Sequence, residues 1–354
     1  MSYPISLSAD YSMARHAFLA AAHKIDALVS SFPHLLTGPN GEPLAIDVAE
    51  LGPSDAEKTV LIVSGTRGVS GFCGSALQTE WLTKHSQDRP DDTRVIMVHG
   101  LNPFGFAWVR LVNEDNVDVN RNFINWSEAP PINADYQEIA HLLVPTRFTE
   151  TVQQRTLDDL FAFIGQWGMA RFQAAMSSAQ FTHPTGLFYG GTGPVWSHRW
   201  LRDWASTVLR DVQHLTILGL YTGLGPWGVG ELLSPRPRDH IEFQRAIQKW
   251  GEVRSLVDDD SVSSDVTGDW LGATNELVPT AEVTGAALIF GTVDIITVLL
   301  ALRADAWLHT HGDPNGPYAR QVRRQVRAAF ADDNPQWIAT CWERFHQVMN
   351  DALA

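Results

Sequence analysis

Four short apolar runs, each followed by a loop that contains glycine, limit what this chain can fold into. The runs cover residues 59–63, 94–99, 214–220 and 286–290. Their length and their content of valine, isoleucine and leucine are typical of buried strands. Helical patterns lie between them, and strands that alternate with helices favour a mostly parallel or mixed sheet. We therefore expect an α/β fold with a mixed central sheet flanked by helices on both faces.

The loops that follow these strands contain the most unusual residues of the chain. They cover residues 65–70, 100–106, 221–230 and 291–294. In open α/β sheets, ligands bind at the carboxyl ends of the strands. We therefore expect one pocket that is built from all four loops.

Helical spacing of apolar residues predicts helices elsewhere, and no linker rich in proline, glycine or serine divides the chain. We expect a single domain over residues 1–354. The predicted helices cover residues 10–31, 75–85, 151–176, 200–211 and, as a C-terminal pair, 318–354. Residues 124–150 form the most irregular stretch, and we expect them to be an insertion over the pocket.

The charge of the chain excludes one class of partner. The 354 residues include 26 basic and 40 acidic side chains, a formal net charge of −14. Nucleic-acid binding needs a basic surface, so we expect no nucleic-acid partner.

No apolar run is long enough to span a membrane, so we expect no membrane partner. The two cysteines, Cys73 and Cys341, do not indicate a disulfide framework, which favours a cytoplasmic protein.

The segment 112–123, VNEDNVDVNRNF, holds the most specific motif. It places Asn120 beside Arg121, shortly after Asp118. A guanidinium group can grip a carboxylate with two hydrogen bonds, and an asparagine amide adds a fixed donor. The pair is therefore a candidate clamp for a substrate carboxylate. The alternative interpretation is a turn in which the asparagine caps a helix and the arginine faces solvent.

Several segments together resemble one family of bacterial carboxypeptidase-like proteins, a domain of unassigned function within the zinc carboxypeptidase clan. The resemblance runs in order along nearly the whole chain. The segments are Ser64–Gln78, His99–Arg110, Asn113–Phe123, Leu187–Thr192, Thr222–Leu233, Phe290–Thr292 and Trp307–Gly312. The resemblance implies the carboxypeptidase-like fold, a mixed central sheet flanked by helices.

The chemistry that the resemblance implies is missing from this sequence. The family holds zinc with a histidine and a glutamate of the first loop, where this chain has Arg67 and Ser70. Tyr221 stands in place of the third ligand, a histidine, and Ile289 in place of the general-base glutamate. A catalytic zinc needs three protein ligands, and isoleucine cannot transfer a proton. We therefore expect no zinc at this site and no other cofactor.

Arginines remain in the inferred pocket. Asn120 and Arg121 keep the clamp, and Arg67 adds a second permanent positive charge. Arg110 is a further candidate, because comparable enzymes place an arginine that stabilises an oxyanion slightly upstream. We expect positive potential that could bind a small anion. Alternatively, Arg67 pairs with a neighbour such as Asp115 or Asp118 and merely fills the space of the metal.

Five other residues are candidates for chemistry. His309 and His311 could form a new metal site, but their spacing alone is weak evidence and a structural role is the simpler interpretation. Ser70 could be a nucleophile, although it is not part of a nucleophile elbow. Cys73 is expected to pack at the start of a helix. Tyr221 could act as a general acid, particularly if Arg67 lowers its pKa, or it could simply fill volume.

These observations support two functional hypotheses. The first is a zinc-free pseudo-peptidase that binds a small carboxylate or a peptide C-terminus, or that regulates an active relative, with a homo-oligomer also conceivable. The second is a repurposed enzyme in which Arg67, Ser70, Tyr221 and the clamp act without metal on a carboxylate-bearing metabolite or peptide. A deliberately inactivated protein is a weaker third alternative, because the four changes differ so much in chemistry.

Overall fold

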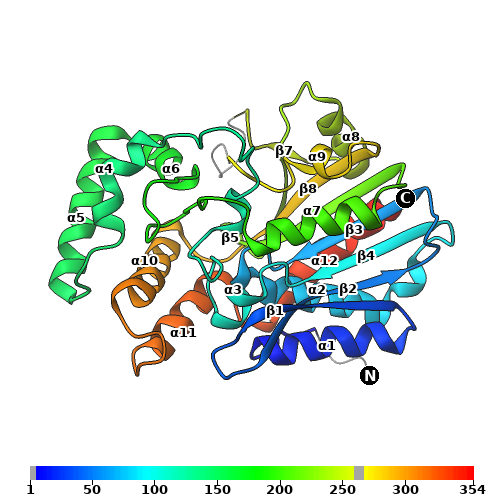
Figure 1. Cartoon of the computed structure of the whole chain (residues 1–354), viewed down its shortest axis with the longest axis horizontal. Helices are drawn as coiled ribbons and strands as arrows, with labels where there is room; N and C mark the ends of the chain where they lie inside the picture. The colour runs from blue at the N-terminus through cyan, green and yellow to red at the C-terminus, as the bar shows by residue number, and fades with distance from the viewer. Residues whose placement is uncertain (1–4, 259–266) are drawn as a thin grey trace.

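An eight-stranded mixed sheet forms the centre of the computed structural model, which describes residues 5–258 and 267–354 (Figure 1). Residues 1–4 and 259–266 lie outside the described part. The strand order is β1-β2-β4-β3-β5-β8-β6-β7. The strands are β1 (Leu28–Thr37), β2 (Pro43–Leu51), β3 (Lys58–Ser64), β4 (Thr93–His99), β5 (His214–Trp227), β6 (Gly230–Ser234), β7 (Arg254–Ser255) and β8 (Glu282–Gly291).

The four predicted strands form the parallel middle of this sheet. β3 pairs in parallel with β4 and β5, and β5 pairs in parallel with β8. The strands that the sequence pattern missed lie outside them. β1 and β2 continue the sheet antiparallel at one edge, and β6 joins β8 antiparallel at the other. The predicted class, a mixed sheet with helices on both faces, is confirmed.

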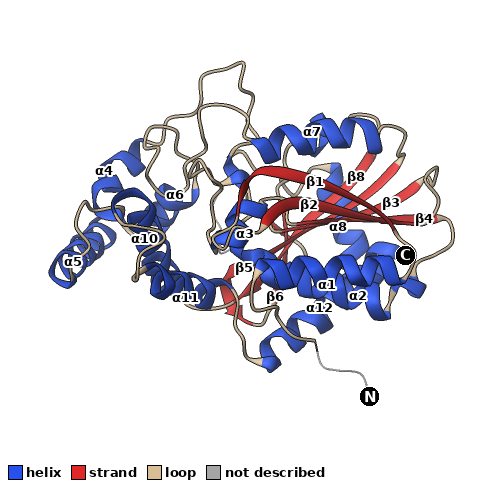
Figure 2. Cartoon of the chain, turned by 60° about the horizontal axis from the view of Figure 1, so that its bottom comes forward, coloured by secondary structure: helices blue, strands red, loops and turns tan. Residues whose placement is uncertain are grey.

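Helices cover both faces of the sheet. They are α1 (Tyr11–Lys24), α2 (Gly71–Lys84), α3 (Pro103–Trp108), α4 (Ala134–Leu143), α5 (Glu150–Trp167), α6 (Met169–Ser177), α7 (Trp196–Val208), α8 (Ile241–Trp250), α9 (Thr274–Leu277), α10 (Ile295–His311), α11 (Ala319–Phe330) and α12 (Pro335–Leu353). Three short 3₁₀ turns cover Gly68–Ser70, Ser86–Asp88 and Val119–Arg121. In Figure 2, α1, α2 and α12 lie on one side of the sheet and α7 on the other.

Side-chain alternation along β3 explains how one strand serves two cores. Val60 and Ile62 pack in a buried cluster with residues of α1, α2, α8 and α12. Leu61 and Val63 belong to the cluster on the opposite face, which includes residues of α7. Because both faces are covered, the strand is an uninterrupted apolar run, the pattern typical of a central parallel strand.

The predicted helix over residues 10–31 is too long. The helix ends at Lys24, and residues 28–37 form the edge strand β1. Val29 matches the helical spacing, but Pro33, four residues further on, lies in the strand and cannot continue a helix. Asp26 marks the break, with a left-handed φ of 55°.

A helical extension formed by α4, α5 and α6 lies at one end of the molecule, beyond α10 (Figure 1). The predicted helix over 151–176 is two helices, divided at Gly168, whose φ is 85°. Buried residues of the extension share a cluster with α10 and α11. The C-terminal segment forms α11 and α12, separated by residues 331–334. Of the helices described, none is both long and apolar enough to cross a membrane.

Candidate functional site

The four loops at the carboxyl ends of the central strands contact one another. The amide of Asn102 donates to the carbonyl of Gly65 at 3.0 Å, which joins the second loop to the first. The hydroxyl of Thr222 lies 3.2 Å from the hydroxyl oxygen of Ser70, which joins the third loop to the first. The amide of Gly228 donates to the carbonyl of Gly291 at 2.9 Å, which joins the third loop to the fourth.

Two glycines allow these loops to approach so closely. A Cβ atom on Gly68 would lie 2.3 Å from the carbonyl oxygen of Arg110. A Cβ atom on Gly291 would lie 2.2 Å from the carbonyl oxygen of Pro226. Both distances are far below van der Waals contact with rigid backbone, so a side chain at either position would push two loops apart. The retained glycines therefore preserve the shape of the site.

A cavity of about 110 Å³ opens beside this loop cluster. The first loop contributes Arg67 and the third contributes residues 221–224, with Ile289 from the end of β8. The second and fourth loops do not line it, so the expectation of a pocket built from all four is only partly correct. The second loop instead packs behind the first. The other lining residues are Leu111, Asn120, Arg121, Phe188, Leu233, Pro235, Leu256, Asp269, Leu271, Ala287, Val298, Leu302 and Phe330.

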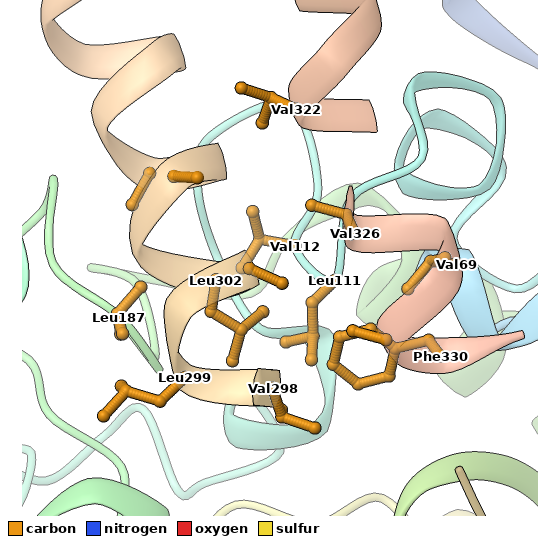
Figure 3. Close-up of a cluster of buried hydrophobic side chains, with 14 of the residues drawn as sticks. Val69, Leu111, Val112, Leu187, Val298, Leu299, Leu302, Val322, Val326 and Phe330 are labelled. Carbon is orange, nitrogen blue, oxygen red and sulfur yellow. The ribbon is translucent and has the colours of Figure 1, made fainter. Parts of the chain in front are cut away.

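One wall of the cavity is apolar. Leu111, Val298, Leu302 and Phe330 project toward one another from three segments of the chain, as Figure 3 shows. Leu302 and Val298 come from α10, and Phe330 comes from α11. This wall joins the cavity to the buried cluster that holds the helical extension in place.

The candidate clamp lies at the polar side of the cavity. Asn120 and Arg121 both line it, and both are buried. The 3₁₀ turn that carries them is capped by Asp118, whose side chain accepts from the amide of Asn120 at 2.9 Å. A guanidinium nitrogen of Arg121 donates to the carbonyl of Asn120 at 2.9 Å. Arg121 is therefore part of a built turn, and the alternative of a solvent-facing arginine is wrong.

Arg67 both lines the cavity and has a carboxylate partner. Its guanidinium lies 3.3 Å from a carboxylate oxygen of the fully buried Asp118. The same oxygen lies 3.9 Å from the guanidinium of Arg121. Of the two acidic neighbours considered from the sequence, Asp118 is the one that forms the ion pair. Two arginines thus share one carboxylate at the polar side of the site.

Burial shifts the pKa values of the charged groups here. The pKa of Arg121 is lowered to about 10, mainly by burial and then by the positive charge of Arg67. Burial raises the pKa of Asp269, although the charges of Arg121 and Arg67 oppose that shift. The carboxylates of Asp118 and Asp269 therefore offset part of the positive charge that the sequence predicted for this pocket.

Tyr221 is held at the cavity by two hydrogen bonds. Its hydroxyl donates to the side-chain oxygen of Asn120 at 3.1 Å and accepts from the indole nitrogen of Trp270 at 2.6 Å. Burial raises its pKa well above the usual range, and the opposing effect of Arg67 is smaller. Arg67 therefore does lower the pKa of Tyr221, as considered from the sequence, but burial outweighs it and the net pKa is raised. Ile289 lies opposite Tyr221 in the register of β5 and β8.

Two predicted site residues lie outside the cavity. Ser70 is buried, and its hydroxyl oxygen is bound to Thr222, so its role in the structure is to join two loops. Arg110 is buried and forms an ion pair with Asp305 at 3.0 Å, because α10 places that carboxylate beside it. Residues 124–150 do not line the cavity either. Arg303 of α10 donates to the carbonyls of Leu142 and Leu143 at the end of α4, and a cover over the pocket stays a prediction.

The other candidates occupy structural positions. His309 lies 3.6 Å from Asp305 and edge-on to Trp108, and burial lowers its pKa to about 4. His311 is exposed at the end of α10. Both cysteines are free and buried, and burial raises the pKa of the Cys73 thiol. Cys73 packs within α2, as expected.

The residues around the cavity do not fit a zinc ion. Protein zinc sites use cysteine, histidine, aspartate and glutamate. Among the described lining residues only Asp269 belongs to these types, and two guanidinium groups face the same space. A cation there would meet two positive charges with one carboxylate on the cavity surface.

Asp269 and Trp270 are the site residues that sequence reasoning missed. They follow residues 259–266 in a segment that has neither helical nor strand periodicity. The only available signal is a buried-type tryptophan next to an acidic residue, Gly-Asp-Trp-Leu-Gly, in an otherwise polar stretch. The amide of Phe123 donates to the carbonyl of Gly268 at 3.0 Å, which brings this segment to the clamp.

Solved structures share the outline of this chain at low identity. Carboxypeptidase A from Helicoverpa armigera is 13% identical, with a TM-score of 0.47, and the match covers 92% of this chain and 74% of that one. Bovine thrombin-activatable fibrinolysis inhibitor, in complex with tick carboxypeptidase inhibitor, is 12% identical, with a TM-score of 0.47 and coverage of 98% and 99%. An aspartoacylase family protein from Mesorhizobium loti is 12% identical, with a TM-score of 0.38 and coverage of 86% and 68%.

A model of one protein family matches nearly the whole sequence of this chain. No curated protein sequence matches the chain. The family DUF2817, described as a protein of unknown function, matches residues 7–344. Because this match spans nearly the whole chain, the protein belongs to the DUF2817 family, in agreement with the sequence resemblance to a carboxypeptidase-like family of unassigned function.

Proposed function

We propose that this protein binds a small carboxylate with an apolar body and does not hydrolyse peptides with zinc. The observation that carries the proposal is the cavity itself, in which Arg67, Asn120 and Arg121 face a wall of aliphatic and aromatic side chains. A carboxylate group would bind at the arginines, and its hydrocarbon part would bury against the wall. The same chemistry fits the C-terminus of a peptide that ends in an apolar residue.

The polar side supports an anionic ligand for an electrostatic reason. Two guanidinium groups lie beside the single carboxylate of Asp118 at this side of the cavity. The buried Nε of Arg67 has no hydrogen-bond partner among the described residues. A ligand carboxylate would supply acceptors and a negative charge in a space of low dielectric, where such bonds are strong.

The apolar side supports selection by hydrophobic contact. Most of the lining residues are aliphatic or aromatic, and the greater part of these are buried. A ligand without a hydrocarbon body would leave this part of the cavity to water. A short branched or aromatic carboxylate would fill it and bind more tightly, by about 0.8 kcal/mol for each CH₂ group buried.

The lack of zinc chemistry rests on the side chains at four positions. By resemblance, Arg67, Ser70 and Tyr221 replace the family's ligands, and Ile289 replaces its general base. None of the three has the donor chemistry of a zinc ligand here: one is a cation, one is bound to Thr222, and one is a neutral phenol with a raised pKa. We infer a binding or regulatory role, for which an active relative is a suitable partner.

Calorimetric titration with three probes tests the binding proposal. We expect 4-methylpentanoate to bind, while 4-methylpentanamide tests the charge and acetate tests the hydrocarbon body. Both of these should bind at least about tenfold more weakly, a difference of 1.4 kcal/mol or more. Equal binding of the acid and the amide would refute the role of the arginines, and no binding of any probe would refute the ligand class.

Two arginine variants and one control assign the binding to the cavity. Arg67→Gln should weaken 4-methylpentanoate binding by about ten- to hundredfold, because a hydrogen bond to a charged group contributes about 1.5–3 kcal/mol. Arg67→Lys keeps the charge but loses the planar fork of donors. Its affinity for 4-methylpentanoate should therefore lie between those of wild type and Arg67→Gln. Arg202→Gln removes the same charge from an exposed arginine on α7 and should bind like wild type. Melting temperatures of all three show whether each variant is folded.

A metal-independent enzyme is the second candidate, and Asp269 favours it. Burial raises the pKa of Asp269, and a carboxyl group beside Arg121 and Tyr221 is a candidate for proton transfer to or from a substrate. Cleavage of N-acetylleucine that survives EDTA and disappears in Asp269→Asn would support this candidate. Turnover that EDTA abolishes would contradict both proposals, because it would require a metal.

A further inference from the structure

A second cluster of chemically active side chains lies far along α2 from the cavity. α2 begins at the first loop of the site and ends at Lys84, and His85 and Asp88 follow in the next turn. His346 approaches them from α12. Among the residues that the structure describes, these three form the one group of histidine, cysteine or acidic side chains close enough to share a metal ion.

We propose that His85, Asp88 and His346 form a zinc site that joins the end of α2 to α12. One ligand atom from each residue lies within 4.8 Å of the others. The Nδ1 atom of His85 is 2.8 Å from a carboxylate oxygen of Asp88, and the Nε2 atom of His346 is 4.0 Å from the same oxygen. This inference is independent of the proposed function, because none of the three residues lines the cavity.

The spacing suits tetrahedral zinc. With bonds of about 2.0–2.1 Å, two ligand atoms of a tetrahedral site lie about 3.3 Å apart. The Asp88 oxygen lies 2.8 Å from His85 and 4.0 Å from His346, one value below and one above that separation. Side-chain movements of roughly 1 Å would bring the three ligand atoms around one ion. Two imidazoles and one carboxylate leave the fourth position to water. Zinc accepts this mixture of nitrogen and oxygen, whereas Mg²⁺ and Ca²⁺ prefer oxygen alone.

The surroundings of His346 hold its ring in place for such a role. The Trp342 ring stacks on it, with centroids 5.3 Å apart and planes inclined by 11°. The centroid of the His85 ring lies 4.2 Å from the centroid of the His346 ring. The side-chain amide of Asn350 lies 3.4 Å from the Nε2 atom. An ion bound at the Nε2 atom would replace this contact with Asn350.

A metal here would connect two helices of the same face of the sheet. α2 and α12 pack together, and residues of both belong to one buried cluster. The side chains of His85 and His346 are each about a quarter to a third exposed, so an ion can enter from solvent. Binding to the folded chain alone would raise its stability by mass action.

Zinc titration of the full chain, without an affinity tag and after treatment with EDTA and desalting, tests the proposal. We expect one zinc ion per chain and a higher melting temperature with zinc. Asp88→Asn and His346→Gln should each weaken zinc binding by at least about tenfold. His23→Gln removes an exposed histidine of α1 and should bind zinc like wild type. With Co²⁺, the wild type should show the visible absorption bands of tetrahedral coordination by nitrogen and oxygen.

Three outcomes would overturn the proposal. They are no stoichiometric zinc binding by wild type, unchanged binding in both Asp88→Asn and His346→Gln, or loss of binding in His23→Gln alone. Asp88 is half-exposed in a turn, so its variant should fold even if the loss of His346 disturbs the helix packing. Zinc that persists in both variants and is lost in Asp269→Asn would instead lie in the cavity and contradict the proposed function.

Discussion

Replacing Tyr221 with phenylalanine removes one oxygen from the centre of the candidate site and tests the hydrogen-bond network there. The indole of Trp270, which is 1% exposed, would lose its 2.6 Å acceptor, and Asn120 would lose a donor at 3.1 Å. A buried polar group without a partner costs about 1–3 kcal/mol. Asn120 borders the cavity, where water can replace the hydroxyl. The loss of its hydrogen bond therefore costs less than the loss at Trp270. We expect Tyr221→Phe to lower the free energy of unfolding by about 2–4 kcal/mol.

Calorimetry of thermal unfolding at neutral pH measures this effect. An unfolding entropy of about 2.1 cal/mol/K per residue implies a fall in melting temperature of about 3–5 °C for a chain of this length. Tyr318→Phe, at an exposed tyrosine, is the matched control and should change the melting temperature by less than about 1 °C. A Tyr221→Phe protein as stable as the control would refute the network and leave Tyr221 as a filler of volume.

Three further predictions concern charge. Affinity for a sulfonate probe, which stays ionised, should rise as pH falls through the raised pKa of Asp269, and Asp269→Asn should abolish that dependence. Asp305→Asn should destabilise the fold by about 3–5 kcal/mol in urea unfolding, because buried Arg110 loses its negatively charged partner and keeps only the neutral Asn116, and the double variant Asp305→Leu with Arg110→Met should cost less. His99 has a folded pKa of about 4 against 6.5 unfolded, so the unfolded chain binds the proton first. Because of this group, the free energy of unfolding should fall by about 2 kcal/mol between pH 7 and pH 5. His99→Gln should lack that fall.

The middle of the sheet was predictable because burial on both faces makes a strand apolar throughout. β3 and β4 are such strands, and the pattern identifies them directly. The edge strand β1 alternates exposed and half-buried residues and contains Pro33, so it lacks the signal. In β2, Asp47 interrupts the apolar pattern, although it is fully buried and bound by Arg15 at 2.6 Å. Local pattern cannot show such a partner.

The candidate site was predictable only where loops carry their own motif. The Asn120-Arg121 clamp and Arg67 were found from the sequence, and they line the same cavity. Arg110 was expected in the pocket but pairs with Asp305, almost two hundred residues away in the chain. Asp269 contributes the opposite charge from a segment without periodicity. In both cases the missing information is a pairing between distant segments.

The position of the helical extension within the connectivity bears on how this protein reaches its fold. β3 and β5 are neighbours in the sheet, yet roughly 150 residues separate them, and the extension makes up nearly a third of that connection. The entropy of closing a loop grows only with the logarithm of its length, so the extension adds about 0.3 kcal/mol to that closure. The entropy of loop closure is therefore no obstacle to these helices, which are held by their packing against α10 and α11. The rate of folding, however, depends on pairings between strands that are far apart in the sequence. Slow folding is therefore the expected consequence.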